Sequence, residues 1–143
     1  MSSDDLKMLK IISNLHDIGK IAINDKILNK PGKLTNEEWD EIKRHPEIGY
    51  RILSSIPEYA RIAEDILSHH ENYDGKGYPR GLKGEEIPIR ARIIALADAY
   101  DAMISDRPYR KGMSHLDAIK EIKRCRGMQF DPNVTDIFLK LYE

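Results

Sequence analysis

The sequence lacks several features that would place it in other classes of protein. Its single cysteine, Cys125, excludes an intramolecular disulfide and fits a reducing, cytoplasmic compartment. No apolar run approaches the roughly 20 residues of a membrane-spanning helix, and the first residues lack the basic and apolar regions of a signal peptide. The formal net charge of -1 provides no broad basic field for nucleic acid polymers. A phosphate ligand would therefore need a local basic cluster.

Strand patterns are also missing, because no segment alternates apolar and polar residues with a period of two. Apolar residues recur at helical spacing instead, as in Leu6, Leu9, Ile12 and Leu15. The 143 residues, 41% of them hydrophobic, fit one domain that can bury a core. We therefore predict an all-α helical bundle in a single domain over residues 1–143.

Capping residues and prolines set the predicted helix bounds. Thr35 to Glu38 has the pattern of a capping box, and Pro46 and Pro57 suit the first turns of helices. The glycine-rich segment 71–88 predicts a structured loop, long enough to be functional. The predicted helices cover 4–17, 36–44, 46–55, a segment from Pro57 into His69, 89–104, 114–125 and 131–142, with a loop over 19–34.

A histidine and an aspartate stand side by side in His16-Asp17-Ile18-Gly19-Lys20. Adjacent helical residues point about 100° apart, so both side chains can reach one metal ion from a helix end. We expect Gly19 to let the backbone turn without a Cβ penalty. Lys20 brings a positive charge to a site where phosphate could bind. Taken alone, such a pair is more often a hydrogen-bonded surface pair than a metal site.

Three further histidines change this balance because they also lie at predicted helix ends. His45 precedes Pro46, and His69 and His70 are adjacent. Asp98 lies in an apolar helix, where an unpaired carboxylate is costly to bury. Such nitrogen and carboxylate ligands suit Fe, Mn or Zn better than Mg or Ca. A bridging carboxylate such as Asp17 would hold two ions about 3.5–4 Å apart, an arrangement that hydrolyses phosphate esters.

Ordinary structural roles stay open for each of these residues. His45 could cap a helix, and His69 and His70 could bond the last carbonyls of theirs. Asp98 and Asp101 could pair with arginines. All of these readings together would require four independent coincidences.

A basic segment, Arg107-Pro108-Tyr109-Arg110-Lys111, follows the Asp98 helix. Arginine's planar fork suits bidentate binding of phosphate, and a solvated basic loop is the alternative reading. Tyr73 and Tyr78 could stack on a base or pack their loop down, and spacing does not decide between the two. His115 reads as an ordinary surface residue.

Together these motifs closely resemble the HD-GYP family, a branch of the HD superfamily of metal-dependent phosphohydrolases. The resemblance covers nearly the whole chain. The matching segments are His16-Asp17-Ile18-Gly19-Lys20, residues 28–35, His45-Pro46-Glu47-Ile48-Gly49, residues 69–79 with the naming Gly77-Tyr78-Pro79, residues 98–102, the Arg107–Arg110 segment and Phe130-Asp131-Pro132.

The resemblance implies an HD-type bundle that hydrolyses cyclic di-GMP to pGpG or GMP. It implies two or three divalent ions, most readily Fe or Mn, with Zn or Ni as alternatives. Asp17 would bridge two of these ions. The implied metal ligands are His16, Asp17, His45, His69, His70 and Asp98.

The resemblance also implies roles around the metal ions. Lys20, Arg107 and Arg110 would contact the substrate phosphates. Asp101 would lie behind the ligands or assist proton transfer, so that Asp17, Lys20 and Asp101 form the implied catalytic set. The Gly77-Tyr78-Pro79 loop would offer a surface to partners, commonly GGDEF-type domains.

The chain departs from the family pattern at its N-terminus, because no histidine precedes His16. Family members carry further helices there, which supply an upstream histidine ligand. We therefore expect a bundle that is truncated at the N-terminus and whose first helix has a partly exposed apolar stripe, so that the chain self-associates. We also expect the ion held by His16, Asp17 and Asp98 to be loosely bound or replaced by solvent. The alternative function is a shortened, weakly active or inactive module that binds nucleotide or a partner protein.

Overall fold

The computed structural model describes residues 1–107 and 110–142. These residues form helices joined by loops, and the only β pairing among them is two isolated bridges. No helix in this part of the chain is long and apolar enough to cross a membrane. The predicted all-α class is confirmed. In chain order, the elements are α1 (Ser3–Leu15), η1 (Ile18–Ala22), α2 (Asp25–Leu28), α3 (Asn36–Ile42), α4 (His45–Ser54), η2 (Ala60–Ile62), α5 (Ala63–Ser68), η3 (Gly84–Glu86), α6 (Ile89–Ile104), α7 (His115–Arg124) and α8 (Pro132–Leu139).

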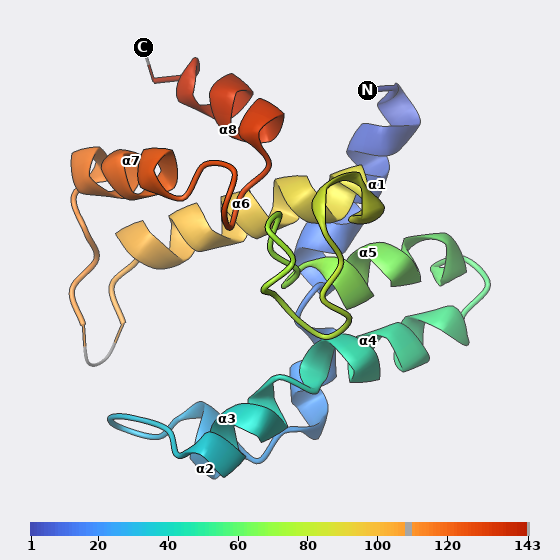
Figure 1. Cartoon of the computed structure of the whole chain (residues 1–143). Helices are drawn as coiled ribbons and strands as arrows, with labels where there is room; N and C mark the ends of the chain where they lie inside the picture. The colour runs from blue at the N-terminus through green and yellow to red at the C-terminus, as the bar shows by residue number, and fades with distance from the viewer. Residues whose placement is uncertain (108–109, 143) are drawn as a thin grey trace.

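Helix α6 runs through the middle of the molecule and joins its two halves (Figure 1). It contacts α1 and α5 on one side, and α7 and α8 on the other. Ile94 of α6 belongs to a core cluster with Ile12 and Ile66, whereas Leu96 belongs to a second cluster with Ile122 and Phe130. Ile94 and Leu96 are two residues apart, so their side chains point about 200° apart around the helix axis. Opposite faces of α6 therefore contribute to the two cores.

Local capping explains several helix starts. Thr35 and Glu38 form the predicted capping box at α3, and the Ser114 side chain accepts from the Asp117 amide at α7. Ser2 and Asp5 form a further capping box at α1. Each box satisfies backbone amides that a helix start leaves without partners.

Several predicted bounds were wrong, and α3 and α8 end two and three residues earlier than predicted, at Ile42 and Leu139. Helix α1 ends at Leu15, so Asp17 lies beyond it. The predicted loop over 19–34 contains η1 and α2, the latter capped by Asn24. The helix expected from Pro57 begins as η2, and α5 starts only at Ala63. Elements this short depend on caps and tertiary contacts, which apolar periodicity does not reveal.

The apolar stripe of α1 is partly exposed, as expected. Leu6 is 59% exposed, whereas Ile12 is fully buried and Met8 nearly so. The buried part of the stripe lies against α5 and α6, which both contact α1.

Gly19 has a different role from the expected turn. Its φ is not positive, but a Cβ atom there would lie 1.9 Å from the His45 carbonyl oxygen and 2.7 Å from the Gly49 amide nitrogen. The missing side chain lets η1 lie directly against the first turns of α4. This contact brings Asp17 next to His45.

We predict that Gly19→Ala destabilises the fold, because the methyl group would force η1 away from α4. Overpacking of this kind costs about 1–3 kcal/mol or more. Urea unfolding monitored by circular dichroism measures the change. Ile21→Ala, at an exposed position of the same short helix, is the matched control and should unfold like the parent. Equal midpoints for Gly19→Ala and the parent would contradict the close-approach argument.

Candidate metal centre

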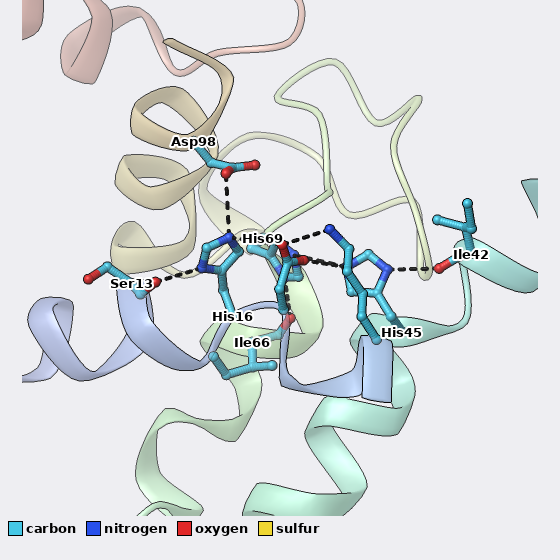
Figure 2. Close-up of polar contacts among 9 residues, drawn as sticks. Ser13, His16, Ile42, His45, Ile66, His69 and Asp98 are labelled. Atoms are coloured by element: carbon cyan, nitrogen blue, oxygen red, sulfur yellow. Dashed lines mark hydrogen bonds and ion pairs between the residues drawn. The ribbon is translucent and has the colours of Figure 1, made fainter. Parts of the chain in front are cut away.

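Four separate parts of the chain bring histidines and aspartates together. His16 is the C-cap of α1, and Asp17 follows it. His45 is the first residue of α4, and His69 is the C-cap of α5. Asp98 comes from the middle of α6. In Figure 2 the rings of His16, His45 and His69 point toward one another, although they come from three helices.

Asp17 lies at the centre of this cluster. Its Oδ1 atom is 3.2 Å from His45 Nε2 and 3.9 Å from His69 Nε2. The His45 and His69 Nε2 atoms are 3.3 Å apart. In the described part of the chain, Asp17, His45, His69 and His70 each offer a ligand atom within 4.8 Å of the others.

The same backbone contact orients three of the histidines. Nδ1 of His16, His45 and His69 lies 2.9, 2.7 and 2.6 Å from the carbonyl oxygen three residues earlier, of Ser13, Ile42 and Ile66 respectively. A carbonyl oxygen only accepts, so each Nδ1 carries the proton. In the neutral rings, each Nε2 therefore presents its lone pair to the cluster. Metal-binding histidines are commonly oriented in this way, by a contact between the other ring nitrogen and an acceptor behind it.

The electrostatic environment keeps these groups in ligand form. Burial lowers the pKa of His69 and of His70 to about 3, so both rings are neutral near pH 7. Burial opposes the charge of Asp17, yet the neighbouring Lys20 ammonium helps to hold its pKa well below the usual value. Neutral imidazoles beside a carboxylate are the forms that bind metal.

These residues fit a divalent metal ion. Lone pairs of His45 and His69 face each other and the Asp17 carboxylate, an arrangement that repels unless a cation lies among them. His16 Nε2 and Asp17 Oδ1 are buried with no hydrogen-bond partner in the described residues, and buried polar atoms are rarely left so. The predicted roles of His45 and His69 as helix caps and as ligands are compatible, since Nδ1 contacts a backbone carbonyl and Nε2 faces the cluster.

A second group of ligand atoms adjoins the first. His16 Nε2 lies 3.4 Å from Asp98 Oδ1 and 3.6 Å from Asp17 Oδ2. The interaction with Asp98 raises the pKa of His16, and His16 in turn lowers the pKa of Asp98. Asp98 does not pair with Arg92, which binds Asp131 instead. Asp17 thus touches both groups, as a bridging ligand would.

The predicted catalytic and basic residues adjoin this centre in different ways, either by direct contact or by lining a cavity beside it. Lys20 Nζ is 2.7 Å from Asp17 Oδ2. Asp101 is exposed one turn beyond Asp98 and lines a small cavity with both Asp98 and His16. Arg107 lines a larger cavity that also contacts His45 and His70.

Arg110 is bound to the protein backbone near the end of α6. Its guanidinium donates to the Ala102 carbonyl oxygen at 2.7 Å, and its backbone pairs with that of Arg107. Pro108 and Tyr109, between the two arginines, are outside the described residues. A contact of Arg110 with substrate phosphate stays a prediction.

The Gly77-Tyr78-Pro79 loop lies at the His-Asp cluster itself. The Tyr78 ring stacks on His70, with centroids 4.9 Å apart and planes inclined by 17°. A Cβ at Gly77 would lie 2.5 Å from the His70 carbonyl oxygen, so only glycine permits this approach. The loop therefore packs one ligand in place, a role that the sequence alone left undecided. Its predicted partner surface is untested.

Two supporting residues were missed by sequence reasoning. The buried Glu71 carboxylate accepts from the Arg80 and Leu82 amides at 2.7 and 3.0 Å, which anchors the loop next to His70. Trp39 lines two cavities beside the cluster. A glutamate directly after His69-His70 was the available signal for the first, whereas a single tryptophan in a polar helix gave none.

A family model described as "HD domain" matches residues 1–134 of this chain. The chain belongs to the HD domain family. This confirms the resemblance inferred from its motifs, and HD phosphohydrolases are metal-dependent, which agrees with the cluster of Asp17 and three histidines.

Curated relatives are similar over nearly the whole of this chain. It is 46% identical over 142 residues to the cyclic di-GMP phosphodiesterase response regulator RpfG of Xanthomonas campestris, and 48% identical over 143 residues to a cyclic di-GMP phosphodiesterase of Thermotoga maritima. These alignments cover 98% and 99% of this chain, but 38% and 39% of the relatives. The chain thus spans about two fifths of their length.

The chain is also similar to a relative whose name gives a different substrate. The 3'3'-cGAMP-specific phosphodiesterase 2 of Vibrio cholerae is 38% identical over 145 residues, covering all of this chain and 28% of the relative. A solved structure of a cyclic GMP-AMP specific phosphodiesterase from V. cholerae has the same fold, with a TM-score of 0.76 and 23% identity. The structural alignment covers 99% of this chain and 39% of the V. cholerae chain.

We predict that Asp17→Ala removes most of the bound metal, because Asp17 touches both groups of ligands. The loss of a residue that only orients a ligand already costs about 10–100-fold in affinity, so the loss of the central ligand should cost at least as much. Elemental analysis of Mn²⁺-loaded protein measures the content. His115→Ala removes a histidine outside the cluster and should leave it unchanged. Equal metal in Asp17→Ala and parent would exclude the central role.

Proposed function

We propose that this chain is a metal-dependent phosphodiesterase that opens cyclic dinucleotides, with cyclic di-GMP as the first candidate substrate. The observation that carries this proposal is the convergence of His45, His69, His70 and Asp17 on one point beside a cavity lined by Lys20 and Arg107. A metal cluster next to fixed cations suits an anionic phosphodiester. The names of the relatives at 46% and 48% identity support the choice of cyclic di-GMP.

The residues present would hold two ions. His45, His69, His70 and Asp17 would bind one, and His16 and Asp98 would bind the other with Asp17 between them. This mixture of nitrogen and carboxylate ligands favours Fe or Mn, with Zn or Ni as alternatives. When bound, such ions polarise phosphoryl oxygens and lower the pKa of a bound water.

The chain's own residues would bind and orient the substrate. Arg107 and Lys20 would hold the phosphodiester beside the ligand cluster, so that binding energy is used for positioning. Asp101, which is exposed one turn from Asp98 and lines a cavity with it, would accept or return a proton at the edge of the site. Arg110 would assist from the same basic segment.

A second candidate substrate is 3'3'-cGAMP, because relatives at 38% and 42% identity bear that name. The two substrates share the ring of two phosphodiesters and differ in one base. A panel of both cyclic dinucleotides, with products separated by chromatography, distinguishes them.

Contacts with other proteins form a further part of the proposal. A groove of exposed apolar residues between α6 and α8, lined by Ile89, Ile137 and Leu141, supports self-association. Sedimentation velocity at several concentrations tests it. A GGDEF-type partner at the Gly77-Tyr78-Pro79 loop and a cytoplasmic location stay predictions.

We predict that the chain converts cyclic di-GMP to pGpG under anaerobic conditions with added Fe²⁺ or Mn²⁺. Chelation should abolish turnover, and re-addition of the metal should restore it. Asp17→Ala should lose at least about a thousand-fold in kcat, since the metal supplies most of the transition-state stabilisation. Tight binding without turnover by the metal-loaded parent would favour the alternative, an inactive nucleotide-binding module.

We predict that Arg107→Ala weakens binding of cyclic di-GMP by roughly ten- to a hundred-fold. Charge-assisted contacts are worth about 1.5–3 kcal/mol each. The melting temperature should change little, because Arg107 is exposed. Calorimetric titration and thermal melting measure the two effects. Lys111→Ala, an exposed cation of the same segment, is the control. A large melting shift with unchanged affinity would instead assign Arg107 to the fold.

A further inference from the structure

Two cavities of similar size flank the stacked pair of His70 and Tyr78. Each has a volume of about 380 Å³, within the range of small-molecule sites. We call the first the amide cavity, because Asn72 and Gln129 line it. We call the second the basic cavity, because Lys20, Lys30 and Arg107 line it. Both also reach Asp98, so a ligand held by the metal cluster would extend into either.

Trp39 lines both cavities and is the only tryptophan of the chain. It lies on α3, is 47% exposed, and belongs to neither core cluster. An indole gains most by burying its large apolar surface, and here almost half of it stays in contact with water. A flat aromatic ligand would cover that surface.

The polar groups of the two cavities differ in a way that fits the parts of a nucleotide, since the basic cavity is lined by three cations and the amide cavity by one, Lys76, beside its two amides. The cations of the basic cavity complement phosphate. The side-chain amides of Asn72 and Gln129 each offer a donor and an acceptor, as does the edge of a purine base. The Gln129 segment is held in place, because the Tyr73 amide donates to the Gln129 carbonyl at 3.1 Å and the Asp74 amide donates to the Met128 carbonyl at 2.8 Å.

We propose that Trp39 is the stacking surface for a nucleobase of the substrate, and that Asn72 and Gln129 bind the edge of that base in the amide cavity. This assignment rests on the proposed function, since it identifies the part of the site that recognises the base. Aromatic stacking on a base tolerates different bases, so Trp39 supplies affinity and the amides supply discrimination.

The first test compares a nucleotide with a bare phosphate on Mn²⁺-loaded protein. GMP and inorganic phosphate share the phosphate, so the difference between their affinities isolates the base. We expect GMP to quench the fluorescence of Trp39 and to bind more tightly than phosphate, and phosphate to leave the emission nearly unchanged. Equal affinities for the two, with no quenching by GMP, would overturn the proposal.

The second test uses variants and calorimetric titration. Trp39→Leu should bind GMP between about five- and a hundred-fold more weakly, because one base stack is lost, with unchanged affinity for phosphate. Trp39→Phe keeps a stacking ring and should retain most of the affinity. Tyr142→Leu removes an aromatic ring that is also 47% exposed but lines neither cavity, and should match the parent.

The outcomes separate this inference from the proposed function. Hydrolysis of cyclic di-GMP with the same KM in Trp39→Leu and the parent would overturn the role of Trp39 and leave the function standing. No hydrolysis by the parent, with GMP binding that still depends on Trp39, would overturn the function and leave the base site standing. Equal loss of GMP and phosphate binding in both Trp39 variants would show a structural role and overturn the proposal.

Discussion

The hydrogen bonds from ring Nδ1 atoms to backbone carbonyls are the contacts on which the candidate site depends. His16, His45 and His69 each lie 2.6–2.9 Å from the carbonyl three residues earlier. At a helix end these carbonyls or their neighbours often lack partners, so the fold offers an acceptor at the place where a ligand is needed. One contact thus fixes the proton on Nδ1, sets the ring orientation and aims the other nitrogen at Asp17.

This arrangement costs electrostatic free energy, which the packing of the rest of the fold must offset. Burying neutral imidazoles beside a carboxylate gives lone pairs that face one another, and without a cation they repel. The elements are therefore held from outside the cluster, by the close contact of Gly19 with α4 and by the core shared among α1, α5 and α6. The cluster is imposed by packing, which is typical of sites whose geometry precedes the ligand.

The glycine-rich loop contacts both the His-Asp cluster and the two cavities beside it. Glu71 anchors it through two backbone amides, and Tyr78 lies flat on His70. The same ring lines both the basic cavity, suited to phosphate, and the amide cavity, as Trp39 does. Because one loop both packs on His70 and lines the two cavities, a change in its anchoring would affect the His-Asp cluster and the cavities together.

The sequence by itself determined the all-α class, most helix positions, and the residues of the cluster. Capping boxes, prolines and adjacent His-Asp and His-His pairs act over a few residues, so a short stretch of sequence is enough to predict their effect. Only the tertiary structure decided that His70 stacks on Tyr78, that Ile12 is buried, and that Trp39 lines two cavities. Those facts depend on which elements come together across long stretches of chain. Spacing along a sequence does not encode such contacts, because each one is fixed by the packing of helices that are far apart in the chain.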